Sequence, residues 1–187
     1  MIIWVNGAFG SGKTTLVAEL QRRWPEALAF DPEQVGFVLR EIVEVPTGNF
    51  QDVPLWRRQV AAMAVGLVEE YGRPLLVPMT LVDAGYLREI LHDVRAAGIA
   101  VQHFYLDVPP EVLARRIAER TLGPGDPERE ARIPAWCTAQ IEICAAARRE
   151  LPEDGIHLDG RRPVTELADE VLAVSARGPG GGRRSPA

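Results

Sequence analysis

The sequence predicts an α/β domain in which a parallel five-stranded sheet is covered by helices on both faces. Three observations predict it. Short apolar runs alternate with longer amphipathic stretches along nearly the whole chain, which is the pattern of repeated β-α units. A glycine-rich segment ending in a lysine and a threonine follows the first apolar run. The 187 residues, 47% hydrophobic and 25% charged, have the composition of a globular protein with its own core.

Each expected strand is a short apolar run bounded by turn residues or charges. These runs lie at residues 2–5, 27–30, 75–77, 101–108 and 156–158. The expected helices have apolar residues at helical spacing and lie at residues 14–24, 33–43, 55–71, 84–97, 111–120, 135–150 and 165–174. Because crossovers between parallel strands are right-handed, few topologies remain, and ligands are expected at the carboxyl ends of the strands.

Two segments interrupt this alternation. Residues 121–134, TLGPGDPEREARIP, have the glycine, proline and charge of a surface loop, and we expect a lid over about residues 121–135. Residues 178–187, GPGGGRRSPA, cannot form a core. We therefore expect a single domain over residues 1–176, followed by a disordered tail at residues 177–187. Nothing in the sequence indicates the oligomeric state.

Charge and composition exclude several functional classes. A net charge of −5 without a long basic run argues against binding to nucleic acid. No stretch approaches the roughly 18 apolar residues of a membrane span, so we expect no integral membrane association. The two cysteines, Cys137 and Cys144, would lie about 10 Å apart on one helix, too far for a disulfide. Two buried thiols indicate a reducing cytoplasm as the location.

The firmest functional signal is the segment GAFGSGKT at residues 7–14. It matches the phosphate-binding pattern G-x-x-x-x-G-K-[ST] at every fixed position, between an expected strand and an expected helix. Glycines let the main chain form a nest of N–H groups, to which the helix N-terminus adds its positive dipole end. Lys13 then reaches the β- and γ-phosphates, and the Thr14 hydroxyl binds Mg²⁺. The segment predicts a site for a nucleoside triphosphate and Mg²⁺ in a P-loop NTPase fold, a three-layer sandwich.

Asp31 and Glu33 follow the second expected strand and lie beside the phosphate loop. Asp31 before a proline, with Gln34 three residues later, is typical of a helix N-terminus with a capping side chain. At the carboxyl end of a strand, Asp31 is also placed to accept the proton of an attacking hydroxyl or to hold Mg²⁺ through water. Both roles are compatible, and Glu33 is a weaker candidate for the second.

Arg116 and Arg120 lie on the apolar side of the helix expected at residues 111–120, next to the lid. Because an unpaired buried charge is expensive, two arginines on this side indicate an anionic partner, which is how a kinase clamps a transferred phosphoryl group. The alternative is two side chains whose stems cover apolar surface while their guanidinium groups reach water. The expected catalytic residues are Lys13, Asp31, Arg116 and Arg120, and the expected nucleotide contacts are Gly7, Ala8, Phe9, Gly10, Ser11, Gly12, Lys13, Thr14, Thr15 and Arg116.

The acceptor side is less clearly marked. The third strand ends in VPMT, without the carboxylate that many P-loop ATPases have there, which favours a small kinase. Trp56 recurs with apolar residues at helical spacing, so core packing is the first interpretation and a substrate pocket the alternative. The residues that such a pocket would place at the substrate are Asp31, Glu33, Phe37, Arg40, Phe50, Trp56 and Thr80.

Four segments together resemble the ATP-binding tunicamycin-resistance proteins. They read IIWVNGAFGSGKT from residue 2, FDPEQVGFVLR from residue 30, PLWR from residue 54 and LLVPMT from residue 75. The resemblance covers residues 1 to about 176, and the layout is more distantly similar to chloramphenicol phosphotransferase and nucleoside monophosphate kinases. It implies a cytoplasmic ATP-binding protein that protects against tunicamycin, a uridine-containing, fatty-acylated nucleoside, by phosphorylating one of its hydroxyls. Residues 7–14 would then hold ATP, and Asp31 would be the base.

Two other functions fit the same residues. A protein that binds ATP and sequesters the drug without phosphoryl transfer would use the same loop. A nucleoside monophosphate kinase would use it with UMP or CMP as acceptor. In each case the implied partner is a small molecule.

Overall fold

The computed structural model describes residues 1–81, 83–119, 141, 144 and 155–177. Five strands form one sheet in the order β2-β3-β1-β4-β5, and all neighbouring strands are parallel. This confirms the sheet that the apolar runs predict. The strands are β1 (Ile2–Gly7), β2 (Leu28–Ala29), β3 (Leu75–Met79), β4 (Val101–Asp107) and β5 (Ile156–Asp159).

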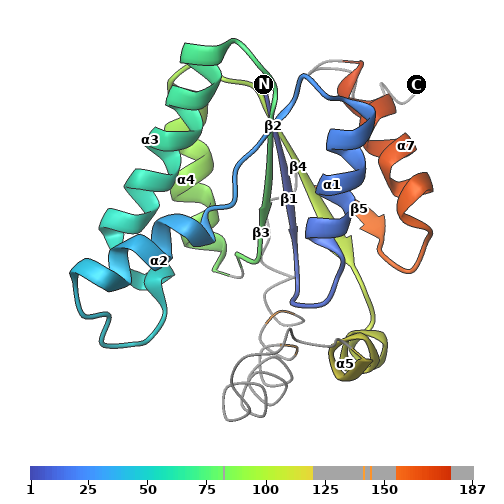
Figure 1. Cartoon of the computed structure of the whole chain (residues 1–187), viewed down its shortest axis with the longest axis horizontal. Coiled ribbons are helices and arrows are strands. Elements are labelled where there is room, and N and C mark those ends of the chain that lie inside the picture. The colour runs from blue at the N-terminus through green and yellow to red at the C-terminus, as the bar shows by residue number, and fades with distance from the viewer. Residues whose placement is uncertain (82, 120–140, 142–143, 145–154, 178–187) are drawn as a thin grey trace, which may run out of the picture.

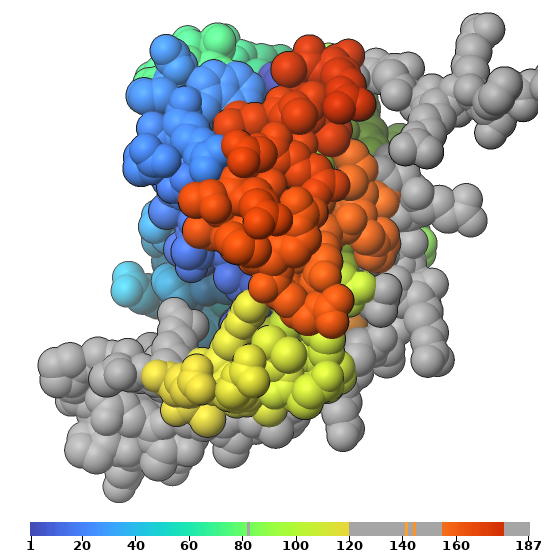
Figure 2. All heavy atoms as spheres, turned by 90° about the vertical axis from the view of Figure 1, so that its right-hand side faces the viewer, coloured from blue at the N-terminus to red at the C-terminus, as the bar shows by residue number. Residues whose placement is uncertain are grey.

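Helices cover both faces of this sheet, which Figure 1 shows close to edge-on. Helices α2, α3 and α4 lie on one face, and α1 and α7 lie on the other. Figure 2 views the second face, where α7 runs beside α1. The helices are α1 (Lys13–Arg23), α2 (Glu33–Ile42), α3 (Pro54–Tyr71), α4 (Ala84–Ala96), α5 (Pro110–Glu119) and α7 (Val164–Ser175), with a 3-10 turn η1 (Phe50–Asp52) between α2 and α3. The three layers are those of the P-loop NTPase fold.

Three expected segments fall outside the described residues wholly or in large part. Of the helix expected at residues 135–150, the structure describes Ile141 and Cys144, both of which are helical. The lid expected at residues 121–135 and the tail at residues 178–187 are not described. Among the described helices, none is both long enough and apolar enough to cross a bilayer.

The central strand explains why its sequence is almost continuously apolar. Successive side chains of a strand point to opposite faces, and here both faces are covered. Ile2 and Trp4 join the core under α3 and α4, whereas Ile3 and Val5 join the core under α1 and α7. All four side chains have an exposed fraction of 0%. The strand that leads into the phosphate loop is therefore fixed from both sides.

Pro78 lies inside β3, although proline cannot donate a ladder hydrogen bond. Backbone groups of β3 alternate in direction: the N–H of Leu75 donates to Met1 at the β1 edge, and the carbonyl of Leu76 accepts from Phe30 on the β2 side. By this alternation the missing N–H of Pro78 faces the β2 side, and β2 pairs only with Leu75 and Leu76. Because β2 ends before it reaches Pro78, the proline leaves no β2 carbonyl without a partner in this ladder. In a longer β2 the same proline would interrupt the hydrogen bonds between the two strands.

Helix α5 lies beyond the carboxyl ends of the strands, at the bottom of Figure 1. Its residues Leu113 and Ile117 are buried with Ala8 of the phosphate loop and Val108 after β4. A Cβ atom at Gly10 would come within 3.1 Å of Ile117, so the loop and the helix are in close contact. This packing brings α5 against the loop between β1 and α1.

Candidate functional site

The loop between β1 and α1 has the backbone that a phosphate nest requires. Gly10 has φ 77° and Gly12 has φ 101°, left-handed values that residues with a Cβ rarely adopt. Gly12 is the N-cap of α1 and has open space around its Cα, so its glycine is required by conformation alone. At Gly7 the requirement is space, because a Cβ there would lie 2.7 Å from Ser11 Oγ and 3.1 Å from the Leu106 carbonyl oxygen.

Lys13 begins α1 and lies back across the loop. Its Nζ donates to the Ala8 carbonyl oxygen at 2.9 Å and lies 5.7 Å from the centre of the Phe9 ring. The ammonium group is thereby held over the same loop whose N–H groups form the nest. A mobile point charge beside main-chain donors is the arrangement that binds the β- and γ-phosphates of a nucleotide. The residues present therefore fit a nucleoside triphosphate.

A pocket of about 320 Å³ opens over this loop. It brings together four segments of the chain: the loop with the start of α1, the turn before α2, the end of β3 and helix α5. Its lining residues are Phe9, Gly10, Gly12, Lys13, Thr14, Thr15, Asp31, Glu33, Pro78, Thr80 and Arg116. Lys13, Thr14, Asp31, Glu33, Thr80 and Arg116, predicted separately from the sequence, thus line one pocket.

Asp31 has the structural role that its sequence context predicts and also lines the pocket. Its Oδ1 accepts from the N–H of Glu33 at 3.0 Å, which satisfies one of the first donors of α2. Pro32 follows, and its carbonyl oxygen accepts from Trp56 Nε1 at 3.1 Å. The turn is therefore fixed at both its side chain and its main chain. A carboxylate held this way, two residues after β2, lines the pocket in a fixed orientation.

Arg116 connects the phosphate loop to the loop after β5. Its guanidinium donates to the Ser11 carbonyl oxygen at 3.2 Å and to the Gly160 carbonyl oxygen at 2.9 Å. A Cβ at Gly160 would meet Val108 at 2.4 Å, so glycine permits the close approach of the loop after β5 to the end of β4. Arg116 thus lines the pocket beside the phosphate loop, and its contact with a nucleotide stays a prediction. Arg120, its expected partner, lies outside the described residues.

The remaining predicted substrate residues are not all at the pocket. Trp56 and Phe50 are buried, with exposed fractions of 0% and 8%, and their rings pack 5.2 Å apart, so core packing describes both. Phe37 is 51% exposed and meets Phe50 edge-on at 6.4 Å. The Arg40 guanidinium lies 4.9 Å from the centre of the Phe50 ring and donates to the Gly48 carbonyl oxygen. None of these four lines the pocket, and their contact with a substrate stays a prediction.

Two residues that the sequence did not reveal hold the segment after β3. The Asn6 side chain accepts from the N–H groups of Gly7 and Leu81 and donates to the Leu81 carbonyl oxygen at 2.8 Å. Gln51 Nε2 donates to the Thr80 carbonyl oxygen at 2.8 Å. The Thr80 hydroxyl itself is buried and has no hydrogen-bond partner in the described part of the chain. The sequence feature that could have revealed this arrangement is Asn6 itself, a polar residue at the end of an otherwise apolar strand.

Arg57 was a further residue without a predicted role. It is 8% exposed, and its Nε contacts Glu89 Oε2 at 2.6 Å while its Nη1 donates to the Gln51 carbonyl oxygen at 2.7 Å. The guanidinium also lies 4.1 Å from the centre of the Tyr86 ring. Burial and the neighbouring Asp52 raise the pKa of the Tyr86 hydroxyl. Arg57 therefore ties η1 to α3 and α4 behind the pocket.

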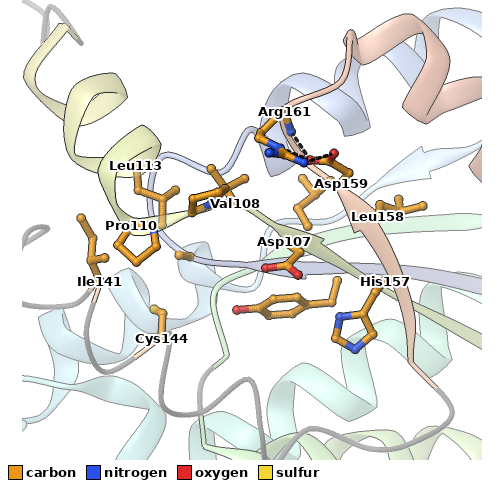
Figure 3. Close-up of a pocket in the computed structure, with 14 residues that line it drawn as sticks. Asp107, Val108, Pro110, Leu113, Ile141, Cys144, His157, Leu158, Asp159 and Arg161 are labelled. Atoms are coloured by element: carbon orange, nitrogen blue, oxygen red, sulfur yellow. Dashed lines mark hydrogen bonds and ion pairs between the residues drawn. The ribbon is translucent and has the colours of Figure 1, made fainter.

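A second cavity, of about 470 Å³, lies at the carboxyl ends of β4 and β5 (Figure 3). Ala8 of the phosphate loop and Cys144 both line it. Burial raises the pKa of the Cys144 thiol, so the uncharged thiol is favoured at neutral pH. Asp159 accepts from Arg161 at 2.8 Å through each of its oxygens, and this arginine lowers the pKa of Asp159 to about 2.

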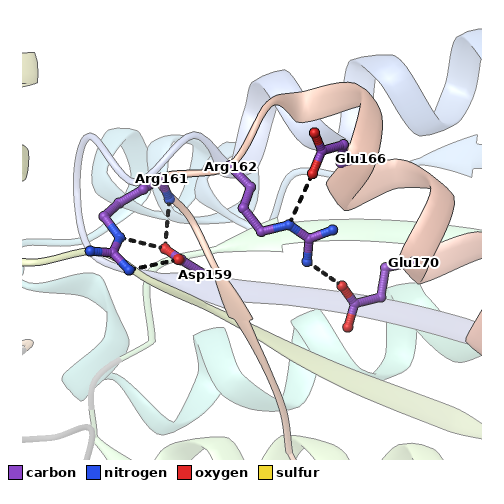
Figure 4. A network of polar contacts seen from close by, with 5 residues as sticks. All are labelled: Asp159, Arg161, Arg162, Glu166 and Glu170. Atoms are coloured by element: carbon purple, nitrogen blue, oxygen red, sulfur yellow. Dashed lines mark hydrogen bonds and ion pairs between the residues drawn. The ribbon is translucent and has the colours of Figure 1, made fainter.

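Arg162 continues this polar network onto α7, as Figure 4 shows. Its guanidinium contacts Glu166 at 3.3 Å and Glu170 at 2.5 Å. The two glutamates lie one turn apart on the helix, so one arginine spans both. The loop between β5 and α7, which also accepts the Arg116 hydrogen bond, is therefore anchored at its helical end.

Comparison with known proteins agrees with this geometry. Residues 2–142 match a family model described as an AAA domain. A search of curated proteins found no match. The tunicamycin resistance protein of Deinococcus radiodurans is similar in structure, with 25% identity and a TM-score of 0.72 over 93% of this chain and 94% of that chain. This confirms the resemblance that the four sequence segments indicate.

Two kinases share the fold at lower identity. A sugar kinase from Janibacter sp. HTCC2649 has 22% identity and a TM-score of 0.63 over 95% of each chain. The Mycobacterium tuberculosis APS kinase, in complex with AMPPNP and APS, has 18% identity and a TM-score of 0.66 over 94% of this chain and 96% of that chain. Since the family model spans the phosphate loop, α5 and four of the five strands, the chain belongs to the AAA domain family and has the P-loop NTPase fold.

Proposed function

We propose that this protein is an ATP-dependent kinase that phosphorylates a hydroxyl of a tunicamycin-like nucleoside antibiotic. The observation that carries the proposal is the meeting of Lys13, Thr14 and Asp31 in one pocket. A P-loop site with a carboxylate beside it has the parts for transfer from a nucleotide to an alcohol. The similarity to the Deinococcus radiodurans tunicamycin resistance protein supports the choice of acceptor.

The residues divide the work of the reaction. The N–H groups of residues 7–14 and the Lys13 ammonium hold the phosphates, and Arg116 lies beside them. Mg²⁺, bound through the Thr14 hydroxyl and through Asp31 by way of water, would neutralise the charge of the triphosphate. Thr15 borders the same wall. Arg120, known here from the sequence alone, is proposed to contact the transferred group.

Asp31 is proposed as the base. As the acceptor oxygen forms its bond to the γ-phosphorus, the bond from that phosphorus to the β,γ-bridging oxygen breaks and ADP leaves. The hydroxyl proton passes to the Asp31 carboxylate. Because Oδ1 of Asp31 already accepts from the Glu33 N–H, the carboxylate enters the reaction in a fixed orientation. Glu33 and Thr80, on the same side of the pocket, are proposed to contact the acceptor.

The test is to incubate the protein with tunicamycin and MgATP and to measure the mass of the drug. A gain of one phosphate group, dependent on both protein and ATP, is the expected result. Unmodified drug that stays tightly bound would instead indicate sequestration with ATP as a structural ligand. Turnover of UMP or CMP alone would indicate a nucleoside monophosphate kinase.

We further propose that the reaction takes place in the cytoplasm.

A further inference from the structure

The positive and negative side chains that line the pocket come from different elements of the fold. Among its described lining residues the cations are Lys13 and Arg116, which belong to the phosphate loop side and to α5. Asp31, Glu33 and Thr80 line the pocket from the start of α2 and the end of β3, and we call these three residues the acceptor wall. In the described part of this wall the charged groups are therefore carboxylates.

Arg57, an arginine connected to this wall through Gln51, is already paired with a carboxylate. The Arg57 guanidinium donates a hydrogen bond to the Gln51 carbonyl oxygen, and the Gln51 side chain donates to the Thr80 carbonyl oxygen. Arg57 is therefore connected to Thr80 through one intervening residue. The same guanidinium pairs with Glu89 and lies against the Tyr86 ring. Its side chain is 10% exposed. A buried arginine with this many contacts stabilises the wall and does not offer its charge to the pocket.

Thr80 supplies the second observation. Its hydroxyl is buried, lies at the acceptor wall and has no hydrogen-bond partner in the described residues. Its main chain is fixed on both sides, by Gln51 at its own carbonyl and by Asn6 at the next residue. A buried hydroxyl with unused hydrogen-bonding capacity is uncommon and destabilising unless a ligand satisfies it. It is a neutral group that can both donate to and accept from another hydroxyl.

We propose that the acceptor meets this wall with an uncharged, hydroxyl-bearing group and that carboxylate or phosphate groups are rejected there. The proposal rests on the proposed function, since it assumes that the acceptor lies on the Asp31 side of the pocket. A hydroxyl donates a charge-assisted hydrogen bond to a carboxylate, whereas an anion is repelled by it. Rejection by like charge is a common means of specificity.

The test compares acceptors that differ in charge. Protein loaded with MgAMPPNP is titrated calorimetrically with uridine and UMP, with glucose and gluconate, and with tunicamycin as a third neutral compound. Within at least one pair the neutral member is expected to bind about 10-fold tighter than its anionic partner. An anionic member that binds as tightly as its neutral partner overturns the proposal. So does the failure of all three neutral compounds to bind.

A variant tests whether the wall causes this preference. Glu33→Gln removes one carboxylate from the wall and is expected to reduce the preference for the neutral member by about 5-fold, as one like charge at close range predicts. Glu41→Gln makes the same change on an exposed part of α2 and should leave the preference unchanged. Equal effects of the two variants would contradict the proposal.

This experiment separates the acceptor class from the chemistry. Because AMPPNP is not a donor in transfer, binding is measured whether or not the protein is a kinase. Preferential binding of a neutral compound, with no mass gain of that compound in MgATP, would contradict the proposed transfer and leave the acceptor class supported. Phosphorylation of UMP or gluconate in preference to the neutral partner would overturn the acceptor class and leave the kinase supported.

Discussion

The nucleotide side of the pocket is formed by one continuous segment, residues 7–15, together with Arg116 of α5. The proposed acceptor side is instead assembled from the start of α2 and the end of β3, which η1 supports through Gln51. On the nucleotide side the binding groups are main-chain N–H groups whose direction depends on local backbone angles. On the acceptor side they are side chains held by partners far away in the sequence. Asn6 and Leu81, for example, are 75 residues apart, and Gln51 and Thr80 are 29 apart. We therefore expect substitutions on the acceptor side to reduce acceptor binding or turnover while leaving the affinity for the nucleotide nearly unchanged.

Asp31→Asn should show this separation most strongly. Turnover is expected to fall by roughly 100-fold to 10,000-fold, the effect of losing a general base, while the dissociation constant of MgATP stays within about 3-fold. The helix should remain capped, because asparagine accepts from the Glu33 N–H as aspartate does. Phosphorylation rates and calorimetry measure the two quantities.

Asp83→Asn is the matched control for that change. Asp83 caps α4 by accepting from the Tyr86 N–H at 2.9 Å, and it does not line the pocket. The same chemical change at this helix N-terminus should leave turnover unaltered. If both variants lose turnover equally, capping rather than chemistry explains the effect of Asp31.

Lys13→Ala should act on the nucleotide side. Removing the ammonium is expected to lower turnover by roughly 100-fold to 1,000-fold, the scale of one lost donor to a developing anion, and to weaken triphosphate binding. Arg22→Ala removes a cation from the same helix. Arg22 is 68% exposed and pairs with Glu19 on the surface, a contact worth little. Calorimetry with MgAMPPNP should show weakened binding for Lys13→Ala and unchanged binding for Arg22→Ala. Unchanged binding in Lys13→Ala would contradict the assignment of Lys13 to the phosphates.

These two sides also differ in how well the sequence predicted them. The phosphate loop was predictable because a contiguous pattern encodes glycine conformations, the lysine and the start of α1. Asp31 was predictable because capping and proximity to the loop follow from its place after β2. The five strands followed from apolar runs, although β2 is only Leu28–Ala29, since it pairs with β3 through two residues.

The acceptor side was predicted less well, for a physical reason. Local periodicity made core packing the first interpretation of Trp56, and the fold confirms it by burying this side chain completely, but periodicity did not identify the residues that hold the acceptor side. Gln51 and Arg57 look like ordinary surface residues until η1 folds against β3 and α4. Their partners depend on strand order and helix packing, which no local pattern contains. Long-range side-chain contacts are therefore the part of this site that required the structure.

Gly36→Ala should destabilise the acceptor side through packing. A Cβ at this position would lie 2.5–2.7 Å from three atoms of the Phe50 ring. The ring is held between Trp56 and Arg40, so it cannot move away cheaply. The free energy of unfolding in urea should fall by about 1–3 kcal/mol. Gly66→Ala on α3, with nothing within 4 Å, should instead raise it by up to about 1 kcal/mol.

Gln51→Glu tests whether the hydrogen bond to Thr80 positions the acceptor. The substitution keeps the size of the side chain but replaces its donor with an oxygen that faces the Thr80 carbonyl oxygen. Acceptor affinity should fall about 10-fold, the effect of losing one hydrogen bond of roughly 1.4 kcal/mol, while MgATP affinity stays within about 2-fold.

The matched control for Gln51, which is half-buried, is a buried glutamine on the other face of the sheet. Gln102 is 8% exposed, and its Nε2 donates to the Val174 carbonyl oxygen at 3.4 Å. Gln102→Glu should lower the free energy of unfolding without changing acceptor affinity, because α7 is remote from the wall that carries Thr80. A loss of acceptor affinity in both variants would mean that general destabilisation is sufficient to disable this side of the pocket. A loss of acceptor affinity confined to Gln51→Glu would show that the hydrogen bond between Gln51 and Thr80, which are 29 residues apart in the sequence, positions the acceptor wall.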